Sequence, residues 1–238
     1  MAQHIRTPLL YSHPLSEIVG KQVFLKLELL QPSGSFKDRG IGNLCMHFAQ
    51  KNDKGFIASS GGNAGMSVAF AGKKLKRKTT IIVPKTTSHM MIQKIRHLHA
   101  QVIVHGDNWN EADELALQKV EEEKLNYIPP FDHPRIWQGY ESLIDEFVQD
   151  NYKPDVIILS VGGGGLFTGI VQGLVKHGWN AIPIITVEPE GAATLAKAIE
   201  KKEHITLTEI KTIAGTLGAK KIANEAYLWC QKWDVLPQ

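Results

Sequence analysis

Residues 32–40 read PSGSFKDRG, a turn rich in serine and glycine that places one lysine directly before a helical pattern. The turn follows a strand-like run at residues 23–27 and precedes an amphipathic segment at residues 41–50. Lys37 therefore lies at the expected start of a helix, where the positive end of the helix dipole disfavours an ammonium and lowers its pKa. A partly neutral lysine can attack a carbonyl carbon and form a Schiff base, although most lysines in polar turns are simply solvated.

A second motif, SSGGNAG at residues 59–65, lies between a strand pattern at 56–58 and a helical pattern at 64–75. Gly61 and Gly62 allow a tight turn and the close approach of a ligand. We expect Ser60 or Asn63 to cap the helix, whose free amides suit a carboxylate. A plain capping turn has the same pattern, so the residues alone leave both interpretations open.

The third motif is SVGGGGL at residues 160–166, between an apolar run at 156–159 and a helical pattern at 167–176. Four consecutive glycines carry an entropic cost that is explained if their amides wrap a phosphate at the helix start. Glu188 lies near the distance expected of the acidic residue in a dinucleotide fingerprint, but the spaced third glycine is missing. A monophosphate is therefore favoured over a nucleotide, and a tight strand–helix junction is the simpler alternative.

Length and composition are those of a globular protein with one large or two small domains. The 238 residues carry a formal net charge of +3, too small to indicate nucleic-acid binding. Cys45 and Cys230 lie in apolar helical patterns, which predicts reduced thiols in a cytoplasmic protein rather than a disulfide framework. The first six residues contain no apolar signal region and no stretch approaches 18 apolar residues, so neither a signal peptide nor a membrane span is predicted.

Short β-rich runs alternate with helical stretches along the chain, which predicts an α/β fold with parallel sheets covered on both faces. The expected strands are residues 23–27, 56–58, 79–83, 102–104, 126–128, 156–161 and 184–187. The expected helices are residues 41–50, 64–75, 89–97, 110–123, 137–148, 167–176 and 192–199.

The three motifs, in this order, resemble those of the fold-type II pyridoxal-phosphate enzymes, and most closely the animal-type L-serine/L-threonine dehydratases. The resemblance extends to PPFDHP at 129–134, IWQG at 136–139 and TIAGTLGA at 212–219, and so covers nearly the whole chain. It implies two open parallel-sheet three-layer domains of the tryptophan synthase β-like type. The large cofactor-binding domain would combine residues 1–40 and 136–238, and the small domain would comprise residues 41–135.

The resemblance also implies a role for each motif. Lys37 would bind the aldehyde of pyridoxal 5'-phosphate covalently and then remove the substrate Cα proton. Phe36 and Thr216 would lie on opposite faces of the cofactor ring, and Asn63 would bond its phenolic oxygen. The phosphate would be held by the amides of Gly162, Gly163, Gly164, Gly165 and Leu166. The substrate would be bound by Ser60, Gly61, Gly62, Asn63 and Ala64. A K+ site would be formed by Glu188 with Gly162, Ala192, Leu217 and Ala219.

The implied activity is that of an L-serine/L-threonine ammonia-lyase, in which β-elimination converts L-serine to pyruvate and ammonia, and L-threonine to 2-oxobutanoate. The preference between the two substrates is open, because Gly61 stands where the closest family members carry another small residue. Two other interpretations also stay open. The first is a different activity on the same scaffold, such as threonine synthase or cysteine synthase. The second is a cofactor-binding remnant without turnover.

One departure concerns the C-terminal part. The family continues for several dozen residues past the position of Gln238, through a Cys-Gly-Gly or Ser-Gly-Gly turn whose side chain faces the pyridine nitrogen. Cys230 is not in such a turn. The chain therefore resembles a member without this part, and we expect a sheet edge and apolar surface to be uncovered. A homodimer is expected from the resemblance, and a partner chain is an alternative source of the segment.

Overall fold

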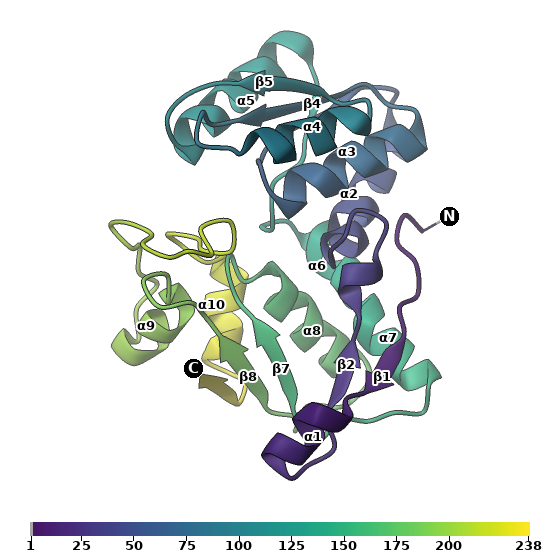
Figure 1. Cartoon of the computed structure of the whole chain (residues 1–238), viewed down its shortest axis with the longest axis vertical. Helices are drawn as coiled ribbons and strands as arrows, with labels where there is room; N and C mark the ends of the chain where they lie inside the picture. Colours follow the sequence, from purple (N-terminus) through teal and green to yellow (C-terminus); the bar gives the residue numbers. More distant parts are fainter. Residues whose placement is uncertain (1) are drawn as a thin grey trace.

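The structure, a computed structural model, describes residues 2–238 and contains three sheets. The four-stranded parallel sheet has the order β5-β4-β3-β6 and the three-stranded parallel sheet has the order β7-β8-β9, whereas β1 and β2 pair antiparallel (Figure 1). The strands are β1 (Leu9–Tyr11), β2 (Phe24–Lys26), β3 (Phe56–Ser59), β4 (Thr79–Val83), β5 (Gln101–Val104), β6 (Asn126–Tyr127), β7 (Ile157–Ser160), β8 (Ile184–Val187) and β9 (Val235–Pro237).

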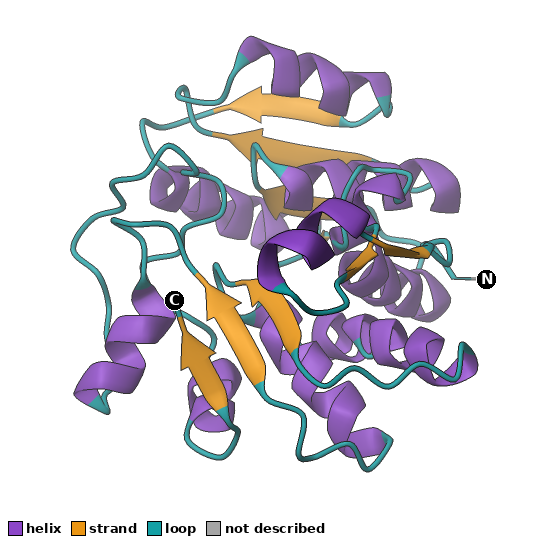
Figure 2. Ribbon diagram, turned by 60° about the horizontal axis from the view of Figure 1, so that its bottom comes forward, coloured by secondary structure: helices purple, strands orange, loops and turns teal. Residues whose placement is uncertain are grey.

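Helices alternate with these strands and lie against the sheets (Figure 2). They are α1 (His13–Val19), the 3-10 helix η1 (Glu28–Leu30), α2 (Lys37–Lys51), α3 (Asn63–Leu75), α4 (His89–His97), α5 (Trp109–Glu123), α6 (Pro134–Tyr140), α7 (Ser142–Gln149), α8 (Gly165–Lys176), α9 (Thr194–Lys201) and α10 (Asn224–Cys230). The α/β fold with parallel sheets is therefore confirmed.

The central strands of the four-stranded sheet are buried on both faces, as the continuous apolar runs predict. Ile57 and Ile82 pack on one face against Ala112 of α5. Phe56 and Ile81, which point to the other face, belong to the main core. This alternation holds the carboxyl ends of β3 and β4 rigidly beneath the loops that follow them.

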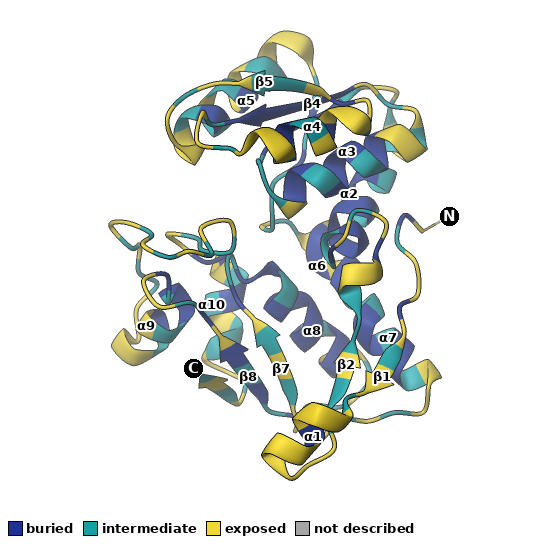
Figure 3. Cartoon of the chain, in the orientation of Figure 1, coloured by how far each residue is buried: buried dark blue, intermediate teal, exposed yellow. Residues whose placement is uncertain are grey.

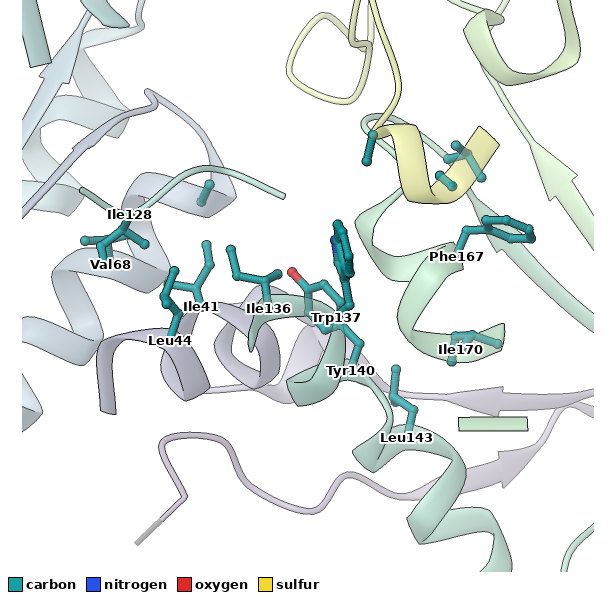
Figure 4. Close-up of a cluster of buried hydrophobic side chains, with 14 of the residues drawn as sticks. Ile41, Leu44, Val68, Ile128, Ile136, Trp137, Tyr140, Leu143, Phe167 and Ile170 are labelled. Atoms are coloured by element: carbon teal, nitrogen blue, oxygen red, sulfur yellow. The ribbon is translucent and has the colours of Figure 1, made fainter. Parts of the chain in front are cut away.

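The main core continues from the four-stranded sheet to the three-stranded sheet through helices α2, α3, α6 and α8. Figure 4 shows this continuity from Val68 through Ile41 and Ile136 to Phe167. Helix α2, which begins at Lys37, lies in the middle of this apolar layer (Figure 3). The start of α2 is therefore held by packing from both sides.

Several local expectations differ from the structure. The predicted helix at 137–148 is divided into α6 and α7, and Ser142 Oγ donates to Gly139 O at 2.7 Å at the division. Such local bonds from a serine hydroxyl compete with regular helix geometry. Five short elements, β1, α1, η1, α10 and β9, were not predicted from the sequence, because each is too short for a periodic pattern to stand out.

The three-stranded sheet has an exposed apolar face, as expected. Ile158 is 63% exposed and Leu236 is 45% exposed. Both are aligned with Ile185 of β8, so they lie on the same face. Strands β7 and β9 each pair only with β8 within residues 2–238, which leaves a free edge on each side of this sheet.

The expected domain division stays a prediction. The strands between residues 41 and 135 do form their own sheet, but the boundary at residues 40 and 41 falls inside α2. Cys45 is buried, Cys230 is half-buried, and both are free thiols. Among the helices in the described part of the chain, none is long and apolar enough to cross a membrane.

Candidate active site

Lys37 is the first residue of α2, and its side-chain amine points inward. Its Nζ donates to Pro130 O at 2.6 Å and lies 5.4 Å from the centroid of the Phe36 ring. Although part of the residue reaches solvent, burial of the amine lowers its pKa from 10.5 to about 8. The predicted direction of the shift is confirmed, and its cause is the removal of water from the ammonium by burial.

The tetraglycine loop joins β7 to α8 and has no room for side chains. A Cβ on Gly162 would lie 1.9 Å from Leu217 O, and a Cβ on Gly163 would lie 2.3 Å from the Phe131 ring. Gly164 has a φ of +84°, a conformation that glycine adopts without strain. The sequence of four glycines is thus required by packing and by backbone geometry.

The backbone amides of this loop are free to bind an anion. The five consecutive N–H groups from Gly162 to Leu166 donate to no protein acceptor within residues 2–238. They lie at the N-terminus of α8, a helix of 12 residues whose dipole favours negative charge there. Successive free amides at such a helix start match the donor set that a phosphate requires.

A second group of free donors lies in the loop between β3 and α3. Helix α3 has Gly62 as its N-cap, with no side-chain capping bond, so the expected capping by Ser60 or Asn63 was wrong. The Ser60 hydroxyl instead accepts from Gly62 N at 3.3 Å. The Asn63 side chain and the amides of Gly61 and Ala64 have no partner among residues 2–238. These donors remain available for a carboxylate or a phenolic oxygen.

Two further segments bring the motifs together. Thr216 Cβ would lie 3.4 Å from a Cβ on Gly62, while the next residue, Leu217, contacts Gly162. Residues 130 and 131 join the other two motifs, because Pro130 O accepts from the Lys37 amine and the Phe131 ring packs on Gly163. The lysine and both groups of free amides therefore border one region.

Sequence reasoning missed several residues of this region. It assigned no role to Phe131, whose ring fills the space beside Gly163, nor to Thr87, whose Oγ1 would lie 2.4 Å from a Cβ on Gly61. The paired prolines at 129 and 130, which fix an extended backbone, were the one local signal for the contact between Phe131 and Gly163. No local signal marked the contact between Thr87 and Gly61, because Thr87 lies 26 positions beyond Gly61.

The proposed cation ligands also lie near one another, but the oxygens of Glu188, Ala192 and Ala219 already have partners. Glu188 is buried, and its carboxylate accepts from Leu195 N at 2.9 Å and Ala196 N at 2.7 Å, at the start of α9. Ala219 O accepts from Thr194 Oγ1 at 2.6 Å. Burial raises the pKa of Glu188 despite these amide bonds. A K+ site formed by Glu188, Gly162, Ala192, Leu217 and Ala219 stays a prediction.

Comparison with known proteins agrees with this geometry. The family model described as "Pyridoxal-phosphate dependent enzyme" matches residues 1–235. An L-serine dehydratase of Dictyostelium discoideum is 44% identical over 98% of this chain and 72% of that protein. An L-serine dehydratase/L-threonine deaminase of Homo sapiens is 41% identical over 99% of this chain and 72% of that protein.

A solved structure gives the same result for the fold. The crystal structure of a fungal L-serine ammonia-lyase from Rhizomucor miehei superposes with a TM-score of 0.92 at 33% identity. The superposition covers 100% of this chain and 76% of the fungal chain. With the family model matched almost from end to end, and with the lysine and free amides in the places described above, this chain belongs to the pyridoxal-phosphate-dependent enzyme family.

Proposed function

We propose that this chain is an L-serine/L-threonine ammonia-lyase, which uses pyridoxal 5'-phosphate to eliminate water from L-serine and release pyruvate and ammonia. The observation that carries the proposal is one buried lysine with a pKa of about 8 beside two separate sets of unpaired amide donors. One set suits a phosphate and the other suits an amino-acid carboxylate. The names of the relatives, L-serine dehydratase and L-serine ammonia-lyase, support the same reaction.

The residues of this chain fit the cofactor. The amides of residues 162–166 would hold its phosphate, Phe36 and Thr216 would lie along its ring, and Asn63 would bond its phenolic oxygen. When bound, pyridoxal phosphate supplies an aldehyde for an amine and an electron sink for the charge left at Cα. The free Asn63 amide and the five free backbone donors are the groups that such a ligand would satisfy.

The protein residues would then divide the work of the reaction. The loop at residues 60–64 would fix the substrate carboxylate, and this would leave the Cα–H bond directed at the Lys37 amine. Lys37 in its neutral form would accept the Cα proton, which burial makes possible near neutral pH. The apolar surroundings of Lys37 and Phe36 would exclude water from the charged substrate.

The competing proposal is a cofactor-binding chain without turnover. The exposed face of Ile158 and Leu236 favours it, because part of the sheet lacks the cover that a stable enzyme needs. The chain spans 72% of the length of the two dehydratases named above. A partner chain that covers this face would reconcile an uncovered sheet with activity.

The test has two steps. Purified protein mixed with pyridoxal phosphate should develop a visible absorption band that Lys37→Ala abolishes and Lys94→Ala, an exposed lysine on α4, retains. Pyruvate release from L-serine, measured with a coupled reductase, should then accompany the band. Absence of the band in the unmodified protein contradicts both proposals, whereas a band without pyruvate supports the remnant.

Four finer expectations stay predictions. We infer a homodimer, a cytoplasmic location, the division at residues 40 and 135, and a K+ dependence of activity. Light scattering on the purified protein tests the first, and replacement of K+ by Na+ in the assay tests the last. The choice between L-serine and L-threonine is measured by the ratio of their kcat/KM values.

A further inference from the structure

The Asp38 side chain has no part in the chemistry proposed above. It directly follows Lys37 in the sequence and is buried, which is energetically unfavourable for a carboxylate. Asp38 is only 1% exposed, and none of the ion pairs of residues 2–238 includes it. A buried carboxylate without a cation is unfavourable unless several donors satisfy it. An apolar residue would occupy this site at lower cost, so the carboxylate calls for an explanation.

Three hydrogen bonds account for the position of the Asp38 carboxylate. Oδ2 accepts from Ser33 N at 2.8 Å and Oδ1 accepts from Ser33 Oγ at 2.5 Å. Oδ1 also accepts from Ser67 Oγ at 2.6 Å, and the two hydroxyl oxygens lie 2.9 Å apart. Hydrogen bonds to an ionised acceptor are short and about twice as strong as neutral ones. Location in the first turn of α2 adds a favourable interaction with the helix dipole.

These bonds connect the two halves of the active site. Ser33 belongs to the turn that presents Lys37, and Asp38 is the residue directly after that lysine. Ser67 lies on α3, four residues after Asn63, so it is on the same side of the helix as Asn63 at the end of the substrate loop. Ser67 is itself 1% exposed, which holds its hydroxyl in one place. The carboxylate thus joins the lysine-bearing turn to the helix that begins in the loop at residues 60–64.

We propose that Asp38 is a positioning residue, whose bonds to Ser33 and Ser67 set the distance between the Lys37 amine and the carboxylate-binding loop at residues 60–64. The inference rests on the proposed function, since it assigns that loop to the substrate. In proton abstraction the amine must lie opposite the Cα–H bond, and an error of about 1 Å costs on the order of 100-fold in rate. One rigid bridge between α2 and α3 fixes this distance before substrate binds.

The decisive variant is Ser67→Ala, which cuts the bridge to α3 and leaves both bonds of Ser33 to Asp38 in place. Its matched control is Thr79→Val, which removes another buried hydroxyl, bonded to Arg77 O at 3.1 Å near the other end of α3. Both variants lose one buried hydroxyl next to the same helix. Only the first loses a contact to the Lys37 turn.

Two measurements are compared for both variants. In protein without cofactor, amide hydrogen exchange of peptides covering residues 33–37 and 60–66 should quicken in Ser67→Ala and stay unchanged in Thr79→Val. In protein loaded with pyridoxal phosphate, Ser67→Ala should lower kcat/KM for L-serine by about 10- to 100-fold. The cofactor affinity should change by less than about threefold, because the phosphate amides are on another helix.

The outcomes separate this inference from the proposed function. Faster exchange in Ser67→Ala with an inactive unmodified enzyme keeps the bridge and rejects the lyase activity. Equal exchange in Ser67→Ala and Thr79→Val overturns the positioning role, as does an unchanged kcat/KM. Should Ser67→Ala not fold, Asp38→Asn weakens the same bridge at its acceptor end, because a neutral amide oxygen accepts weaker hydrogen bonds than a carboxylate, and it must give the same two changes.

Discussion

The lowered pKa of Lys37 gives the sharpest quantitative prediction. At a pKa of about 8, about one tenth of the amine is neutral at pH 7. At the ordinary value of 10.5 the neutral fraction would be about one in 3000. Because only the neutral amine attacks an aldehyde or an acylating reagent, burial should accelerate the reaction of Lys37 at pH 7 by about 300-fold.

The assay is pulse labelling of the cofactor-free protein with an acylating reagent between pH 6 and pH 10.5, read for each lysine by peptide mass spectrometry. Labelling of Lys37 should rise about tenfold per pH unit and level off near pH 8. Lys85 is the internal reference, since its hydrogen bond to Asp107 raises its pKa and its labelling should still rise at pH 10. Lys37→Ala supplies the background.

A Lys37 profile that climbs past pH 10 alongside Lys85 would refute the reasoning. It would mean that water reaches the amine, and that the contact with Pro130 O does not keep the site dry. A profile that levels off near pH 8 but at very low extent would instead report poor access of the reagent. At pH 10.5 the amine is almost fully neutral in the folded protein and half neutral in the unfolded one, so folded and unfolded samples compared at that pH differ mainly in access of the reagent.

Three other substitutions test the structure. Gly61→Ala should raise KM for L-serine about tenfold or more, because the new Cβ meets Thr87 Oγ1. Adding Thr87→Ala should lower KM again, as steady-state kinetics measure. A double variant with a KM as high as that of Gly61→Ala would contradict the clash with Thr87. Arg39→Met should lower the free energy of unfolding by about 3–5 kcal/mol in urea titrations, since the fully buried guanidinium donates to Glu28 and Glu146. A loss below about 1 kcal/mol would show that these ion pairs do not stabilise the fold. Burial acts to raise the pKa of Glu146, but hydrogen bonds from Arg39 and Lys26 lower it on balance. This carboxylate therefore stabilises the fold above its unfolded pKa of about 4.5, and the contribution should vanish as pH falls further. Urea titrations across pH 3–7 should show this loss, and Arg39→Met, in which Lys26 alone pairs with Glu146, should show a smaller one. Ile158→Lys on the exposed sheet face should reduce self-association, measured by light scattering at rising concentration. An unchanged association state would show that this apolar face does not drive self-association.

Local pattern predicted most of the strands and helices near the site. Residues 79–83, 89–97 and 184–187 were assigned with the observed bounds, because apolar periodicity and turn residues are properties of neighbouring positions. The same holds for the three glycine- and serine-rich motifs, each of which does join a strand or a turn to a helix. The division of the helical segment at residues 134–149 into two helices was not predicted, since the break depends on a side-chain hydrogen bond.

Contacts between distant segments could not be predicted in this way. Strand β9 is three residues long and exists only because β8 offers it an edge. The bond from Ser67 to Asp38 spans 29 positions, and the packing of Phe131 on Gly163 spans 32. Such pairs depend on how α2, α3 and α8 pack, which periodicity within one segment does not specify.

The sequence by itself determined where reactive groups would be offered. It placed a lysine at a helix start and glycines at two strand–helix junctions, because backbone freedom and helix dipoles are local matters. Only the tertiary structure decided how those groups behave. Burial of the Lys37 amine among apolar neighbours moves its pKa, and packing of Phe131, Leu217 and Thr216 around the loops leaves their amides free. Removal of water is a collective result of packing, and no single segment of the chain carries it.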